Sequence, residues 1–167
     1  NYPKDKTISA LFEEQVIADP NATAVVFGDE KLSYQQLNER ANHLAHQLKS
    51  KGISENTLVA ISIERSLNMI VGILGILKAG GAYVPIDSEY PAERIEFMLK
   101  DTGAGIILTS SHARTKLPAS EKIEIFVLDE ELAETRNYSA SNLQSTESPG
   151  SLAYIIYTSG STGKPKG

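Results

Sequence analysis

Two spacings of apolar residues alternate along this chain. Segments with the three-to-four-residue spacing of an amphipathic helix begin near Thr7, Ser33, Ser66 and Pro91. Short apolar runs bounded by turn residues, which are typical of strands, cover residues 24–27, 58–63, 105–109, 123–128 and 152–157. This alternation predicts an α/β fold, with a largely parallel sheet flanked by helices.

The helix that follows Ser33 has the clearest boundaries. Ser33 and Gln36 have the spacing of a capping box, in which each side chain satisfies the other residue's free backbone N–H. Gly52 is placed to end the helix. The stripe predicted to be buried consists of Leu37, Ala41, Leu44, Ala45 and Leu48. His43 and His46 lie on the same helix without a third ligand, so we interpret them as surface histidines and predict no metal site.

The next helix, from Ser66 to Gly80, is apolar on almost every side, which predicts burial on every side. Gly72 and Gly75 weaken such a helix intrinsically, and we expect them to allow close packing. Glu64 and Arg65, which precede the helix, resemble a charged active-site pair. We favour a surface ion pair or helix-entry charges instead.

Composition narrows the class of protein. The chain has 167 residues, a net charge of −5 and no cysteine. The acidic balance argues against a nucleic-acid partner, and the lack of cysteine excludes disulfides and thiolate zinc sites. The longest apolar run, 69–77, is too short to span a bilayer, and residues 1–6 lack the apolar core of a signal peptide. We expect a cytoplasmic protein with no membrane partner.

The chemistry is concentrated after the last apolar run. Residues 134–151 are polar and predict a surface loop, and residues 152–157 predict a central, buried strand. Directly afterwards come glycines, hydroxyl side chains and two lysines, which together suit a nucleotide's phosphates. The predicted phosphate-binding residues are Thr158, Ser159, Gly160, Ser161, Thr162, Gly163, Lys164 and Lys166. The alternative is a flexible surface turn.

This loop differs from a Walker A loop. Gly160 and Gly163 are too close together for that motif, and Pro165 stands where Ser or Thr should follow the lysine. Pro165 also lacks a backbone N–H. If the loop binds phosphates, it belongs to a different class of phosphate loop.

Three strings carry a family resemblance. YTSGSTGKPKG (157–167) is very similar to the phosphate-loop signature of the acyl-adenylate-forming superfamily, which includes peptide-synthetase adenylation domains, acyl-CoA synthetases and beetle luciferases. LKAGGAYVPID (77–87) and LSYQQL (32–37) resemble the second and first core motifs of adenylation domains in nonribosomal peptide synthetases. They occur in the family's order, and the similarity extends from Thr7 onward. Residues 83–87 favour amino-acid activation over fatty-acyl activation.

The resemblance implies a ligase that activates an amino acid with ATP as an aminoacyl adenylate and releases pyrophosphate. The aminoacyl group would then pass to phosphopantetheine on a peptidyl carrier domain, with a condensation domain as neighbour, in antibiotic or siderophore biosynthesis. The loop would hold the β- and γ-phosphates, which Mg²⁺ would bridge. Thr158, Ser161 and Thr162 are the preferred hydroxyl donors, and Lys166 is preferred over Lys164 because it matches the family's lysine before glycine.

The resemblance also implies that residues 1–167 are the N-terminal portion of an adenylation domain and contain no catalytic residue. The amino-acid pocket, the adenine and ribose contacts, the principal magnesium ligand and the adenylate-forming lysine lie further along such chains. We therefore expect the remainder of the domain to be a necessary partner. Two alternatives stay open: an acyl- or aryl-CoA synthetase of the same superfamily, and a non-catalytic docking or binding fragment.

Overall fold

The structure is a computed structural model of the 167-residue chain. It describes residues 3–118, 122–130, 137–144, 148–159 and 165–167. The helices are α1 (Ile8–Ala18), α2 (Tyr34–Ser50), α3 (Leu67–Lys78), α4 (Ala92–Thr102) and α5 (Ser111–Arg114). The strands are β1 (Thr23–Phe27), β2 (Glu30–Ser33), β3 (Leu58–Ser62), β4 (Ala82–Pro85), β5 (Ile106–Thr109), β6 (Glu124–Val127), β7 (Thr158–Ser159) and β8 (Pro165–Lys166).

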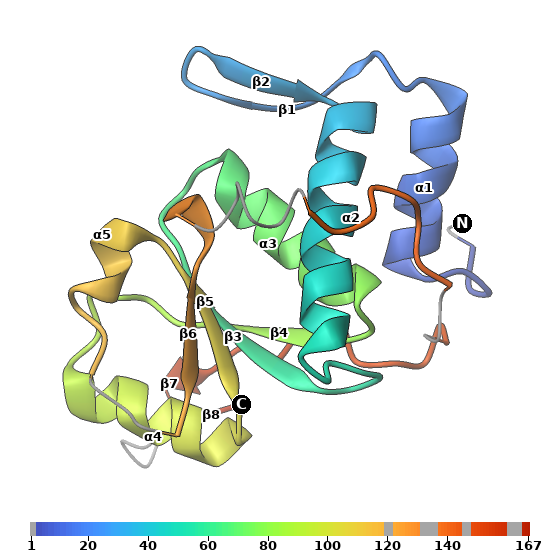
Figure 1. Cartoon of the computed structure of the whole chain (residues 1–167). Coiled ribbons are helices and arrows are strands. Elements are labelled where there is room, and N and C mark those ends of the chain that lie inside the picture. The colour runs from blue at the N-terminus through green and yellow to red at the C-terminus, as the bar shows by residue number, and fades with distance from the viewer. Residues whose placement is uncertain (1–2, 119–121, 131–136, 145–147, 160–164) are drawn as a thin grey trace.

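A four-stranded parallel sheet lies at the centre of the fold (Figure 1). Its strand order is β4-β3-β5-β6, and every neighbouring pair is parallel. From β3 the chain passes through α3 to β4 on one side, whereas from β5 it passes through α5 to β6 on the other. The connections therefore diverge between β3 and β5. In open parallel sheets, ligands bind outside the carboxyl ends of the strands at such a point.

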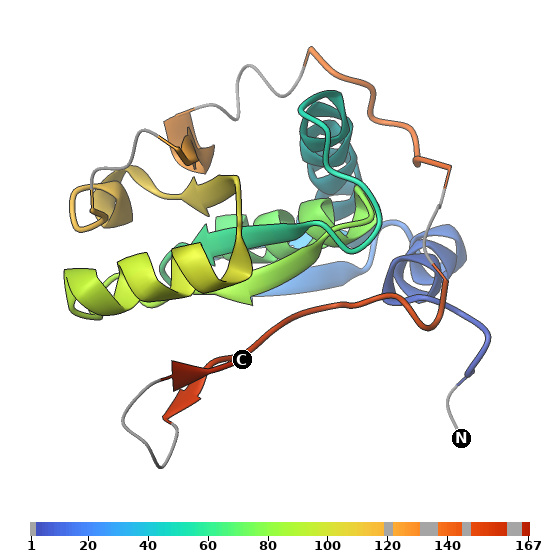
Figure 2. The same cartoon turned by 90° about the horizontal axis from the view of Figure 1, so that it is seen from below.

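Helices cover both faces of this sheet, as the α/β prediction requires. On one face, α2 and α3 pack over a core that includes Val59, Ile61 and Leu108. On the other face, α4 covers a second core that includes Ala60 and Ile107 (Figure 2). Neighbouring residues of β3 thus point into different cores, which is the alternation of a strand buried on both sides.

Local sequence signals set the helix ends. The capping box is present: Gln36 N–H donates to Ser33 Oγ at 3.2 Å, and the Gln36 side chain accepts from Ser33 N–H at 3.0 Å. Ser66 accepts from Met69 N–H at 3.2 Å. The helix predicted to begin near Pro91 starts at Ala92, and Pro91, whose ψ of 141° is extended, is its N-cap residue.

The N-terminal hairpin was only half predicted. β1 pairs antiparallel with β2, and the pair projects beside the start of α2 (Figure 1). The sequence indicated β1 and the turn, where Gly28 has φ +59°. It did not indicate β2, which is four residues long and runs directly into the Ser33 cap.

The prediction of a central, buried strand at residues 152–157 is wrong. This segment lies beside β4, where Tyr83 N–H donates to Ala153 O at 3.0 Å and Ile155 N–H donates to Tyr83 O at 3.1 Å. Leu152, Tyr154 and Ile156 are 49–53% exposed. Every second side chain therefore faces outward. An apolar run alone does not distinguish burial on two sides from burial on one.

Residues 137–144, one of the two described parts of the polar stretch, are hydrogen-bonded along α2. Asn42 Nδ2 donates to Ala140 O at 2.7 Å. His43 Nδ1 and His46 Nε2 lie 2.7 and 3.0 Å from the carbonyl oxygens of Tyr138 and Ser141. Since a carbonyl oxygen only accepts, the proton of each imidazole lies on the nitrogen that faces the carbonyl, which is Nδ1 in His43 and Nε2 in His46. The two histidines are half-buried under this segment, which corrects the surface interpretation.

The contact between α2 and α3 yields a stability prediction. A Cβ added at Gly75 would lie 2.8 Å from Leu44 Cγ, whereas at Gly72 its nearest neighbour is the terminal Ile61 Cδ1 at 3.0 Å. Both alanine substitutions gain about 1 kcal/mol of helix propensity. We expect Gly75→Ala to be less stable than Gly72→Ala by about 1–3 kcal/mol, because only the former overpacks a rigid part of its neighbour.

The measurement is the free energy of unfolding in urea for both variants and the unsubstituted protein. Gly72→Ala is the matched control, because it lies on the same helix. Equal stability of the two variants would show that α2 and α3 do not approach as closely as described.

Candidate functional site

The carboxyl ends of β3 and β4 border a cavity of about 420 Å³. Glu64 and Arg65 follow β3, and Asp87 follows β4. Tyr157, the residue before the predicted phosphate loop, also lines the cavity. The loop therefore begins at the wall of a cavity outside the carboxyl ends of two parallel strands, the end of the sheet at which α/β proteins bind ligands. This cavity lies at β3 and β4, on the opposite side of β3 from the point where the connections diverge.

Side chains at the strand ends are held by one another. Ser110, after β5, donates its hydroxyl to Glu64 Oε2 at 2.5 Å. Arg65 is exposed and, within the residues that the structure describes, forms no ion pair with Glu64. Of the two interpretations that we favoured, the surface ion pair is therefore wrong, and exposed helix-entry charges fit this geometry.

Asp129 fixes the end of β6 in the same way. It accepts from Ser111 N–H at 2.9 Å and from the Ser111 hydroxyl. Burial by itself would raise the pKa of the Asp129 carboxyl, but the two hydrogen bonds from Ser111 outweigh burial and lower that pKa below its ordinary value. This carboxylate stays ionised and holds the start of α5.

The described ends of the predicted phosphate loop pair with each other as antiparallel strands. β7 pairs with β8 so that Thr158 lies opposite Lys166 and Ser159 opposite Pro165 (Figure 2). Among the predicted phosphate-binding residues, the structure brings together Thr158, Ser159 and Lys166 by backbone pairing. The others, Gly160, Ser161, Thr162, Gly163 and Lys164, lie outside the described residues.

Tyr157 anchors the base of this hairpin, a role that the sequence did not suggest. Its side chain is 9% exposed and belongs to the core beneath α4. Its hydroxyl donates to Asp101 Oδ2 on α4 at 2.5 Å. Burial, together with the hydrogen bond and charge of Asp101, raises the pKa of Tyr157 to about 12. The available signal was the residue type, since a buried tyrosine needs a partner for its hydroxyl.

Gly167, directly after β8, rests on the same tyrosine. A Cβ at this position would come within 2.9 Å of Tyr157 Cε2 and 2.7 Å of Ile155 Cγ2. Real side chains do not tolerate such distances, so the glycine allows the backbone to lie against the ring. Tyr157, directly before β7, thus contacts Gly167, directly after β8.

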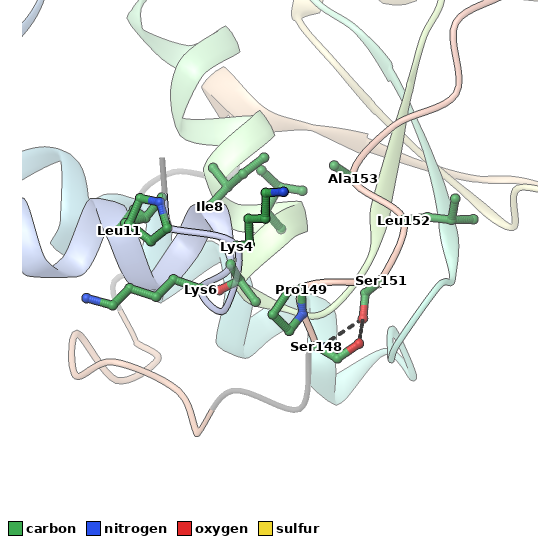
Figure 3. A pocket seen from close by; sticks show the side chains of 12 residues that line it. Lys4, Lys6, Ile8, Leu11, Ser148, Pro149, Ser151, Leu152 and Ala153 are labelled. Atoms are coloured by element: carbon green, nitrogen blue, oxygen red, sulfur yellow. Dashed lines mark hydrogen bonds between the residues drawn. The ribbon is translucent and has the colours of Figure 1, made fainter. Parts of the chain in front are cut away.

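A second cavity, of about 460 Å³, lies between the N-terminal segment and residues 148–153 (Figure 3). Two lysines border it, but Lys6 pairs with Glu14 at 2.6 Å. Ser148 and Ser151 hydrogen-bond with each other. This cavity borders residues 148–153, whereas the β7–β8 pair begins only at Thr158. We therefore do not assign the cavity to the candidate site.

A parallel sheet with helices on both faces places this chain in the α/β class of proteins. Comparison with known families agrees. The sequence pattern of the family described as AMP-binding enzyme matches residues 12–167, and this chain belongs to that family. The resemblance to adenylation domains and the α/β fold are therefore both confirmed.

Curated relatives are peptide synthetases. The chain is 53% identical over 169 residues to tyrocidine synthase 3 of Brevibacillus parabrevis and 47% identical over 165 residues to bacitracin synthase 2 of Bacillus licheniformis. These matches cover 100% and 99% of this chain but only 2% and 6% of those proteins. The chain is thus similar to a small part of each.

Solved structures give the same placement. The nonribosomal peptide synthetase FmoA3 bound to α-methyl-L-serine-AMP matches with a TM-score of 0.89 and 31% identity, over 99% of this chain and 18% of that chain. The N-terminal subdomain of Klebsiella oxytoca NpsA in complex with 3-hydroxybenzoyl-AMSN matches with a TM-score of 0.84 and 28% identity. This match covers 97% of this chain and 40% of that chain.

Two features are absent from the described residues. Over those residues, none of the helices has the length and apolar character needed to cross a membrane. The same part of the chain holds no group of three or more metal-ligating side chains.

Tyr157 gives a prediction for alkaline pH. Its folded pKa of about 12 lies above the ordinary value of 10.0, so ionisation of Tyr157 favours the unfolded chain. The stability that this hydroxyl contributes is fully present below pH 10 and is lost as the pH rises toward 12. We expect the stability advantage of the unsubstituted protein over Tyr157→Phe to be constant near neutral pH and to shrink above pH 10.

Urea unfolding of both proteins across this pH range provides the measurement. A stability difference that stayed constant through pH 12 would contradict a raised pKa for Tyr157.

Proposed function

We propose that this chain provides the loop that binds the phosphates of ATP in an amino-acid adenylation domain of nonribosomal peptide synthesis. The reaction is attack of an amino-acid carboxylate on the α-phosphorus of ATP, which yields an aminoacyl adenylate and releases pyrophosphate. The observation that carries the proposal is the pairing of Thr158 with Lys166 at the base of the glycine loop. Support comes from a family described as AMP-binding enzyme and from relatives named as peptide synthases.

The loop acts on the leaving group. Negative charge grows on the β- and γ-phosphates as pyrophosphate departs, and fixed donors stabilise it without reorganising. Lys166 is the principal charge because it lies opposite Thr158 at the hairpin base. The other proposed contacts are hydroxyls, inward-turned backbone N–H groups and a second lysine, supplied by Thr158, Ser159, Gly160, Ser161, Thr162, Gly163 and Lys164.

Mg²⁺ would neutralise the phosphates and bridge them. The proposed contribution of this chain is hydroxyl, backbone and lysine contacts to the phosphates.

The proposed partners follow from the coverage of the relatives. The chain corresponds to 6% or less of the two synthases reported above, and we propose that the activity requires the remainder of an adenylation domain. The amino-acid substrate, the phosphopantetheine-bearing carrier domain and a condensation domain complete the proposed set. The bound molecule named in the FmoA3 structure, α-methyl-L-serine-AMP, is an amino acid joined to AMP, and it supports this reaction class.

Activation of an aryl acid is the second candidate. The NpsA subdomain, which shares the fold with a TM-score of 0.84, was solved with a 3-hydroxybenzoyl compound. The identity of 47–53% to peptide synthases favours an amino acid. Exchange of pyrophosphate into ATP that depends on amino acids and not on benzoates distinguishes the two.

Replacing Lys166 tests the binding of phosphates by the loop. In an adenylation domain that carries this chain, we expect Lys166→Ala to lower amino-acid-dependent ATP–pyrophosphate exchange about 100- to 1000-fold, the typical effect of losing one positioned electrostatic group. Lys6→Ala is the matched control, because Lys6 pairs with Glu14 away from the hairpin. Unchanged exchange at low ATP in Lys166→Ala would remove this lysine from the site.

The isolated chain provides a second test. We expect residues 1–167 alone to make no aminoacyl adenylate and to associate through their exposed apolar side chains, which include Leu152, Tyr154 and Ile156. Adding the remainder of the domain as a separate polypeptide should restore solubility and pyrophosphate exchange. A monomeric and active 167-residue chain would overturn the proposal that the activity needs the remainder.

A further inference from the structure

Tyr157 and Asp101 connect the base of the predicted phosphate loop to helix α4. We propose that the hydrogen bond between Tyr157 and Asp101 positions the loop base, which makes both residues positioning residues for the phosphates of ATP. The inference deepens the proposed function and rests on it. It concerns two side chains 56 residues apart in the sequence, neither of which belongs to the loop.

The first argument concerns the last hydrogen bonds between the sheet and the segment that leads into the loop. Along the segment before the loop, the last described backbone hydrogen bond to the sheet is Ile155 N–H to Tyr83 O at 3.1 Å. Ile156 is 53% exposed and Thr158 is exposed as well. Between them, Tyr157 is buried and its hydroxyl reaches α4. The entry to the loop is therefore fixed at one side chain.

The second argument is that the exit from the loop uses the same side chain. Gly167 follows β8, and its backbone is so close to the Tyr157 ring that a Cβ would overlap it. Thr158 and Lys166, the flanking residues, are paired with each other. A shift of the Tyr157 ring would therefore displace both strands of the hairpin together.

The third argument is the character of the bond. Asp101 is a carboxylate, and hydrogen bonds to charged acceptors are about twice as strong as those between neutral groups. The raised pKa of Tyr157 keeps its hydroxyl protonated far above neutral pH. Removing the hydroxyl alone leaves the ring packing in place.

The test uses an adenylation domain that carries this chain and compares Tyr157→Phe with the unsubstituted protein. We expect kcat/KM for ATP to fall about 10- to 100-fold, the effect of losing a hydrogen bond to a charged group. The KM for the amino acid should stay unchanged. Tyr154→Phe is the matched control, because it removes a half-exposed tyrosine hydroxyl from the same segment.

Asp101 supplies the rescue experiment. Asp101→Asn keeps an oxygen that accepts from Tyr157 but removes the charge, so its kcat/KM for ATP should lie between that of the unsubstituted protein and that of Tyr157→Phe. Asp101→Ala should lose as much as Tyr157→Phe. Combining Tyr157→Phe with Asp101→Ala should add little further loss, because both remove one interaction. Additive losses, or equal loss in the amino-acid KM, would overturn the positioning role.

Direct ATP binding separates this inference from the proposed function. If the unsubstituted domain showed no amino-acid-dependent exchange, the proposed function would fail. The positioning role would still predict weaker equilibrium binding of ATP in Tyr157→Phe than in Tyr154→Phe. Equal ATP affinity in the two variants, with only a lower melting temperature for Tyr157→Phe, would reduce the pair to a structural contact.

Discussion

Helix α3 requires cover on every side, and much of the fold is arranged to provide it. Its apolar side chains contact α2 and the central sheet, and Gly75 lets Leu44 of α2 approach its backbone. At its C-terminus Lys78 is 4% exposed, and its ammonium pairs with Glu13 of α1. A buried charge is costly unless it is paired, so α1 is fixed next to α3 by charge as well as by apolar contact.

Cover for α3 also determines where chemistry can occur. With α2 and α3 on one face of the sheet and α4 on the other, the edge formed by the strand ends remains for a ligand. The hairpin of residues 158–166 departs from that edge beside the cavity that Tyr157 lines. The rigid sheet positions the loop, and the loop carries the side chains proposed to act on phosphate.

Sequence patterns predicted those structural features that depend on residues close together in the chain. The capping box at Ser33 and Gln36 is set by residues three apart, and it was confirmed. The position of residues 152–157 at one side of β4 depends on tertiary pairing, so the apolar run gave the wrong burial. In the site, the glycine and lysine pattern indicated the loop. The residue type of Tyr157 indicated that its hydroxyl needs a partner, but nothing local identified that partner as Asp101, 56 residues away.

The fastening of residues 138–142 along α2 changes how the chain closes its longest connection. Between β6 and the segment beside β4, the polypeptide would otherwise form a single long loop, whose closure entropy grows with the logarithm of its length. Asn42 and Asn38 hold its middle through hydrogen bonds to Ala140 and Asn142. These hydrogen bonds divide the connection into two shorter stretches. Because closure entropy changes slowly with length, insertions in either stretch cost little, while the bonded residues keep the distant segment within reach of the sheet.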